Sequence, residues 1–125
     1  MEREKQNSNY KTNKMEKKLG KIENVTFGCG GYNDSMLGLS VTLSGKSWGV
    51  SDFKGDWDAE RVKHSEFTKW SEEDRSKKYD ETMRFLSKLL KEAKVSTVDQ
   101  LKGKPVEVTL DGNVLREWRI LTEVL

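Results

Sequence analysis

Apolar and polar residues alternate most regularly in the last part of the chain, residues 103–125. The alternation runs up to an Asp-Gly-Asn triplet at 111–113 and resumes after it, which is a strong local signal for a β-hairpin. Leucine and valine also alternate with small polar residues at 37–43, which predicts a half-buried strand. Shorter apolar patterns predict strands at 22–27 and 48–53.

The period changes after a polar stretch, residues 54–69, in which we expect a loop and a fourth strand around Val62 to Phe67. Ser71, followed three residues later by Asp74, resembles a capping box that opens a helix reaching about Lys94. Five residues fall within one apolar arc of that helix: Tyr79, Met83, Leu86, Leu90 and Ala93.

Phe85 lies roughly 100° from the centre of this arc, at the fringe of the apolar stripe, so its ring is expected either to rim the core or to face something else. A second short helix fits Ser96 to Lys102, before Gly103. The predicted fold class is therefore α+β, with an antiparallel sheet of about six strands and two helices inserted between the fourth and fifth strands. Residues 1–18 lack any apolar pattern and are expected to be a disordered leader, which leaves a single domain at 19–125.

Charge and composition narrow the function classes. The chain is 34% hydrophobic and 35% charged, so its core is thin and a homo-oligomer would bury more of it. The net charge is +2, and a nearly neutral body argues against a duplex DNA partner. The single cysteine, Cys29, excludes an intrachain disulfide and indicates a reducing compartment. Because no apolar run approaches the roughly 20 residues needed to cross a bilayer, we expect a soluble intracellular protein without a membrane partner.

Catalytic chemistry finds little support in the sequence. Cys29 and the sole histidine, His64, lie far apart, and no spacing of His, Cys, Asp or Glu indicates a metal site. No nucleophile elbow, phosphate-binding loop or dinucleotide fingerprint is present. We therefore expect a binding protein that is not an enzyme and uses no cofactor or metal.

Several residues are candidates for ligand binding. The glycine-rich run at 28–31 leads into Tyr32 and Asn33; it could offer backbone N–H groups to an anion, although spacing alone favours a simple turn. Trp48 is one of four tryptophans, enough for a stacking platform as well as a core. Arg116 and Arg119 lie on the second strand of the predicted hairpin and point to opposite faces.

Arg116 lies on the same face of the predicted strand as Trp118 and Ile120, and the other residues of that face form a buried pattern. A buried guanidinium needs an anionic partner. The sequence leaves two partners equally open: a glutamate of a neighbouring subunit or the phosphate of a ligand.

The chain resembles the phage Thoeris anti-defence proteins of the first type over residues 19–125. Five segments carry the likeness: Phe27-Gly28-x-Gly30-Gly31-Tyr32, Gly38-Leu39-Ser40, Trp70-x-Glu72-x-Asp74-Arg75, Lys104-Pro105-Val106-Glu107-Val108 and Leu115-x-x-Trp118-Arg119-Ile120-Leu121-Thr122-Glu123. The resemblance implies an antiparallel sheet with two helices inserted before the last two strands, which build a dimer.

The resemblance also implies a function: a sponge that binds the signal of bacterial Thoeris immunity, 1''-3' glycocyclic ADP-ribose, without degrading it. The NAD-degrading effector then stays inactive in the cytoplasm of the infected bacterial host. Some members assemble dimers into hexamers and hold cyclic trinucleotides, as used in CBASS immunity, at a separate site.

In that family an aromatic residue on the long helix and an arginine on the last strand contact the ligand, and Phe85 and Arg116 match them here. A second family arginine would fall near Gly112 or Asn113 and is missing, so Arg119 or Arg61 would have to replace it. Two other readings stay open: a single-stranded nucleic-acid binder that uses its sheet and basic leader, and a purely structural oligomeric phage protein.

Overall fold

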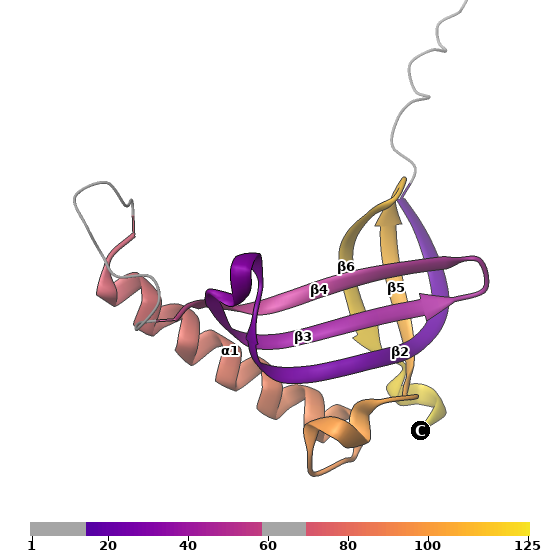
Figure 1. Ribbon diagram of the computed structural model, residues 1–125. Helices are drawn as coiled ribbons and strands as arrows, with labels where there is room; N and C mark the ends of the chain where they lie inside the picture. Colours follow the sequence, from indigo (N-terminus) through magenta and orange to yellow (C-terminus); the bar gives the residue numbers. More distant parts are fainter. Residues whose placement is uncertain (1–14, 59–69) are drawn as a thin grey trace, which may run out of the picture.

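The computed structural model describes residues 15–58 and 70–125, which form one strongly curled antiparallel sheet and one α-helix (Figure 1). The elements in chain order are β2 (Met15–Gly30), η1 (Tyr32–Asp34), β3 (Met36–Gly45), β4 (Trp48–Trp57), α1 (Glu72–Ala93), η2 (Val98–Leu101), β5 (Pro105–Asp111), β6 (Val114–Ile120) and η3 (Thr122–Val124), where η marks a 3-10 helix. The predicted fourth strand, around Val62 to Phe67, and residues 1–14 of the predicted leader lie outside the described residues.

The long strand β2 organises the sheet, whose strand order is β4-β3-β2-β5-β6. Its first part, Met15 to Lys21, pairs with β5, and its second part, Lys21 to Gly30, pairs with β3. Between the two parts β2 bends, so that the β5–β6 hairpin crosses the β3–β4 hairpin at a steep angle in Figure 1. The sheet therefore curls, and its two edge strands, β4 and β6, come into contact.

A β-bulge at Glu23 accompanies this bend, because Ile22 pairs with Leu43 and Asn24 already pairs with the next residue of β3. The extra residue places Ile22 and Val25, three positions apart, on the same buried face. Phe27, which the apolar pattern groups with them, is 43% exposed. The bulge thus explains an apolar spacing that a regular strand does not produce.

The helix α1 begins and ends as its sequence predicts. The side chain of Ser71 accepts a hydrogen bond from the Asp74 amide, and the Asp74 carboxylate accepts one from the Ser71 amide at 2.9 Å. At the other end, Lys94 adopts a left-handed conformation that closes the helix.

The buried face of α1 is rotated from the predicted apolar arc. Its buried residues are Arg75, Thr82, Leu86, Leu89 and Ala93. Thr82 is tolerated there because its hydroxyl donates to the carbonyl of Lys78 at 2.8 Å. Met83, predicted to be apolar core, is 56% exposed, whereas Phe85 is half-buried against the core. The predicted arc was therefore wrong at Met83.

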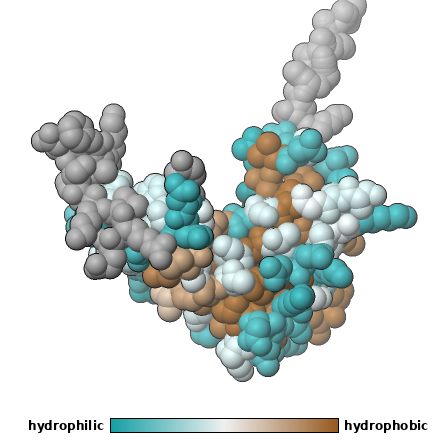
Figure 2. Space-filling view, in the orientation of Figure 1, coloured by the Kyte–Doolittle hydropathy of each residue, from teal (hydrophilic) through white to brown (hydrophobic). Residues whose placement is uncertain are grey.

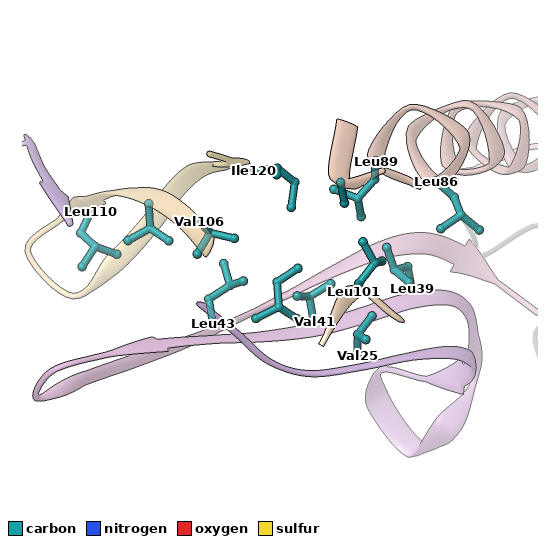
Figure 3. Packing of buried hydrophobic residues seen from close by; sticks show 13 residues of the cluster. Val25, Leu39, Val41, Leu43, Leu86, Leu89, Leu101, Val106, Leu110 and Ile120 are labelled. Atoms are coloured by element: carbon teal, nitrogen blue, oxygen red, sulfur yellow. The ribbon is translucent and has the colours of Figure 1, made fainter. Parts of the chain in front are cut away.

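The core fills the space between the curled sheet and α1 (Figure 3). Leu39, Val41 and Leu43 come from β3, while Val106 and Ile120 come from the opposite hairpin. Figure 3 shows Ile120 pointing towards Leu89 of the helix. The β5–β6 hairpin and α1 are thus held against each other by apolar contacts from both sides.

Several sequence expectations need correction. Five strands are described rather than about six, and the predicted helix at Ser96 to Lys102 is the single-turn 3-10 helix η2. Residues 15–18, assigned to the leader, are the first residues of β2, because they pair with β5. The α+β class, the antiparallel sheet and the terminal hairpin are confirmed. Among the described residues, no helix combines the length and apolarity needed to cross a membrane.

A row of three glycines crosses the sheet, with Gly28 paired to Gly38 and Gly38 paired to Gly55. A Cβ atom added to Gly38 would lie 2.1 Å from the carbonyl oxygen of Lys54, whereas one added to Gly28 meets no atom within 4 Å. We therefore expect Gly38→Ala to lower the free energy of unfolding by about 1–3 kcal/mol, as overpacking does. Gly28→Ala, the matched control, should leave it nearly unchanged. Urea unfolding measures both, and equal effects would contradict the close backbone approach.

Candidate ligand-binding site

The candidate site lies where the two edges of the curled sheet meet α1. Trp118 of β6 donates from its indole nitrogen to the Asp52 carboxylate of β4 at 2.9 Å, which bridges the two edges. The ring of Phe85, from α1, meets the ring of Trp118 edge-on, with centroids 6.1 Å apart and planes at 80°. Three elements that are distant in sequence thus converge on one aromatic pair, whose edge-on geometry is a favourable one.

Three adjoining hollows surround Phe85. The β4 hollow, of about 400 Å³, is lined by Phe53, Lys54, Gly55, Lys78, Glu81, Thr82 and Phe85. The central hollow, of about 150 Å³, is lined by Asp52, Lys54, Phe85, Leu115, Arg116, Glu117 and Trp118. The β6 hollow, of about 310 Å³, is lined by Phe85, Lys88, Leu89, Glu92, Trp118, Arg119 and Ile120. Phe85 is common to all three, so one aromatic ring forms the shared wall of a branched groove.

Arg116 reaches the central hollow from an irregular point of β6. Thr109 pairs with Glu117 and Leu110 with Leu115, which leaves Arg116 as the extra residue of a β-bulge. Its side chain is 52% exposed, and its Nη2 donates to Asp111 at 3.0 Å. The predicted buried position was therefore wrong, because the bulge interrupts the alternation. The anionic partner that the structure gives it is Asp111 of its own hairpin.

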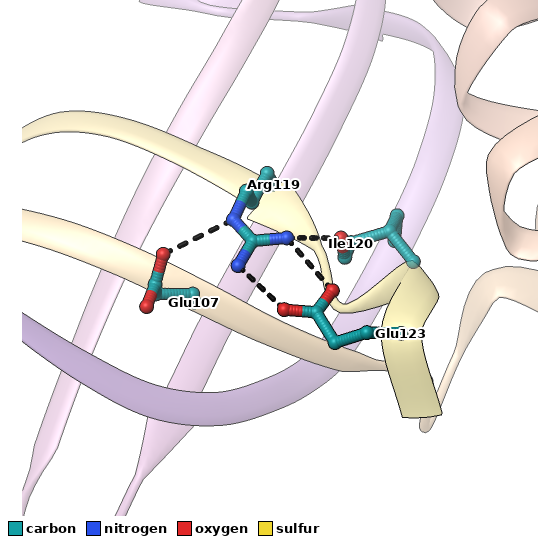
Figure 4. Close-up of polar contacts among 4 residues, drawn as sticks. All are labelled: Glu107, Arg119, Ile120 and Glu123. Atoms are coloured by element: carbon teal, nitrogen blue, oxygen red, sulfur yellow. Dashed lines mark hydrogen bonds and ion pairs between the residues drawn. The ribbon is translucent and has the colours of Figure 1, made fainter. Parts of the chain in front are cut away.

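Arg119 acts as a clamp on the C-terminal turn η3 (Figure 4). Its Nε donates to Glu107 at 3.1 Å, its Nη2 to Glu123 at 2.8 Å, and its Nη1 to both Glu123 and the carbonyl of Ile120. These two carboxylates raise the pKa of Arg119, and Arg119 lowers the pKa of Glu123 to about 2. Every nitrogen of this guanidinium is engaged within the protein.

The glycine run, Asn33 and Trp48 lie outside the three hollows. Gly28 to Gly30 belong to β2 and pair with β3, so the glycine run is largely strand rather than an open loop, and only Gly31 takes a positive φ, of 71°. Tyr32 and Asn33 form the turn η1 that follows. Trp48 packs on Gly20 and Gly45, where added Cβ atoms would lie 2.6 Å and 2.4 Å from its ring. Neither Asn33, Trp48 nor the glycine run lines a hollow that contains Phe85. His64 and Arg61 lie outside the described residues.

Sequence reasoning missed two polar residues of the site, Asp52 and Lys54. Both pair with buried residues of β3, Asp52 with Val41 and Lys54 with Leu39, and therefore share the core-facing side of β4 with Val50. Two charged residues on the apolar side of a strand are the signal that could have revealed them.

The arrangement suits a ligand that combines a flat ring with an anionic group. Phe85 offers an aromatic surface, and among the described residues Arg116 donates one hydrogen bond, to Asp111, so that other N–H groups can donate to an oxyanion. In the part of the chain that is described, no group of three or more His, Cys, Asp or Glu side chains could hold a metal ion. No family model, curated protein or solved structure matches this chain.

The bridge between Trp118 and Asp52 should contribute measurably to stability. Replacing Trp118 with phenylalanine keeps an aromatic ring but leaves the half-buried Asp52 carboxylate without its indole donor. We expect a loss of about 1–3 kcal/mol in the free energy of unfolding. Asp52→Asn, which retains an acceptor oxygen, should lose less. Chemical denaturation compares them, and a Trp118→Phe variant as stable as the wild type would contradict the bridge.

The Arg119 clamp predicts a dependence of stability on pH. Because the pKa of Glu123 is about 2 in the folded protein, below its ordinary 4.5, its ion pair stabilises the fold above about pH 4.5. This contribution is lost as the pH falls from 4.5 towards 2. Glu123→Gln should therefore lose less stability over this range than the wild type.

A suitable control is Glu117→Gln, because Glu117 forms no ion pair among the described residues. Carboxyl NMR titration of the wild type measures the pKa of Glu123 directly. A value near 4.5 would contradict the clamp.

Proposed function

We propose that this protein is a sponge that captures a cyclic ADP-ribose isomer, 1''-3' glycocyclic ADP-ribose, and holds it without chemical change. One observation carries the proposal: Phe85 of α1 and Arg116 of β6, the two residues that the family resemblance selects, line the same central hollow. They are 31 positions apart (116 − 85) and lie on different elements, so only the fold brings them together. An aromatic ring beside an arginine is the pairing that nucleotide recognition needs.

In this proposal adenine stacks on Phe85, an interaction that contributes about 1–3 kcal/mol per stacked base. Trp118, which meets Phe85 edge-on, fixes the orientation of that ring. Asp111 holds Arg116 by one nitrogen, and the remaining donors of the guanidinium bind one phosphate of the ligand. Arg119 is not a phosphate contact here, because its nitrogens already bind Glu107, Glu123 and the carbonyl of Ile120.

A sponge has to enclose its ligand, since nM affinity requires about −12 kcal/mol of binding free energy. The central hollow of about 150 Å³ is smaller than the roughly 300–1,000 Å³ of ordinary ligand pockets. The ligand therefore extends into the neighbouring hollows, and a second copy of the chain closes them. β6 is an edge strand of the sheet, and Val114 at its start is half-exposed, so we expect this end of β6 to build that dimer.

The exposed side of the sheet gives less support to the alternative function, binding of single-stranded nucleic acid. That side of β2, β3 and β4 presents small polar residues and an aromatic ring, among them Thr26, Ser40, Thr42, Ser51 and Phe53. Figure 2, in the orientation of Figure 1, shows pale and brown residues in the middle of the view, with teal residues both beside them and along the border. Among the described residues, these pairings place few cations on this face, with Lys21 opposite Ser44 at its end, so it offers few of the phosphate contacts that strand binding requires.

The direct test is capture and release. Incubating excess protein with purified 1''-3' glycocyclic ADP-ribose should deplete the free compound, and heat denaturation should return it intact. Chromatography with mass detection follows both steps. Recovery of a linear or hydrolysed product would overturn the non-catalytic part of the proposal, and no depletion would overturn the function itself.

Arg116→Ala should weaken capture strongly, with a loss of at least about tenfold in affinity for each charge-assisted hydrogen bond removed. Arg84→Ala is the matched control, because Arg84 also forms an exposed ion pair, with Asp80 at 2.9 Å, but lines none of the three hollows. Calorimetric titration of the two variants with the same compound separates a site residue from a general loss of charge. Equal affinities would remove Arg116 from the site.

A further inference from the structure

The ring of Phe85 is already covered on one face by a cation. Lys54 of β4 holds its Nζ 5.4 Å from the centroid of the Phe85 ring. Lys54 lines both the β4 hollow and the central hollow, the latter together with Arg116. We propose that Lys54 binds the second phosphate of the cyclic ligand and leaves the face of Phe85 to do so; this assignment rests on the function proposed above.

A second phosphate contact has to be found because the glycine run does not supply it. Gly28 to Gly30 are paired with β3, and none of them lines a hollow that contains Phe85. A ligand with two phosphates, bound only through Arg116, would keep one negative charge desolvated and unpaired, which is unfavourable. Within one copy of the chain, the described residues that can supply the missing contact are the other cations beside Phe85.

Five cations of the described residues line the three hollows: Lys54, Lys78, Lys88, Arg116 and Arg119. Lys78 pairs with Glu81, and the two arginines pair with carboxylates of the β5–β6 hairpin and the C-terminal turn. Among the described residues, Lys54 and Lys88 form no ion pair, and Lys88 lines only the β6 hollow. Of these five cations, Lys54 is therefore the one that has no carboxylate partner among the described residues and also lines the central hollow with Arg116.

The contact between Lys54 and Phe85 is suited to exchange. A cation–π contact at an exposed site is weaker than a charge-assisted hydrogen bond to phosphate, so a ligand that supplies phosphate replaces it favourably. The flexible four-carbon stem of lysine allows the ammonium to move aside while the backbone of β4 stays in place. The incoming base then occupies the ring face that the ammonium leaves.

The test is calorimetric titration of 1''-3' glycocyclic ADP-ribose into the full-length wild type, Lys54→Met and Lys54→Arg. Lys54→Met keeps a stem of similar length without the charge and should weaken binding by at least about tenfold. Lys54→Arg, which restores the charge, should stay within about threefold of the wild type. Because the lost contact is electrostatic, the deficit of Lys54→Met should shrink as the salt concentration rises.

Lys46→Met is the matched control, because it removes the same charge from an exposed position in the turn between β3 and β4. It should bind as the wild type does. Three outcomes would overturn the role of Lys54 while the wild type still binds: an unchanged affinity in Lys54→Met, an equal loss of affinity in Lys46→Met, or a deficit of Lys54→Met that does not depend on salt. Each of them would leave the sponge function standing. Absence of binding by the wild type would overturn both.

Discussion

The bend of β2 is the constraint on which the rest of this structure depends. One strand pairs with β5 through its first part and with β3 through its second, with a bulge at Glu23 between them. Because both hairpins pair with the same bent strand, the outer edge strands β4 and β6 come into contact. The hydrogen bond from Trp118 to Asp52 then joins the edges, and α1 presents Phe85 at the junction. Without that bend, Phe85 and Arg116 would have no common hollow.

Local signals in the sequence predicted the local structure well. The Asp-Gly-Asn triplet specifies the turn of the β5–β6 hairpin, with Gly112 at a φ of 64° that glycine adopts freely. Ser71 and Asp74 specify the start of α1 through a reciprocal pair of hydrogen bonds. In both cases the residues that carry the signal also make the contacts, so no knowledge of the tertiary fold is required.

The predictions failed where tertiary pairing decides the outcome. A bulge depends on the partner strand, so the alternation along β6 could not predict that Arg116 would be its extra residue or that Asp111 would pair with it. The predicted helical arc included Met83 and omitted Thr82, because hydropathy does not register a hydroxyl satisfied by its own helix. Asp52 and Lys54 were missed for a related reason. Asp52 accepts a hydrogen bond from Trp118 and Lys54 contacts the Phe85 ring, and both contacts form only in the folded chain.

The site joins two kinds of cation with different tasks. Arg119 is fully engaged and holds the C-terminal turn to the sheet, whereas Arg116 donates to Asp111 through one nitrogen and Lys54 lies over the Phe85 ring. The central claim is that a nucleotide stacks on the ring between them. Intermolecular NOEs in the complex with 1''-3' glycocyclic ADP-ribose test it most directly. The account predicts NOEs from the adenine protons to the Phe85 ring and the Trp118 indole, and NOEs confined to other residues would contradict it.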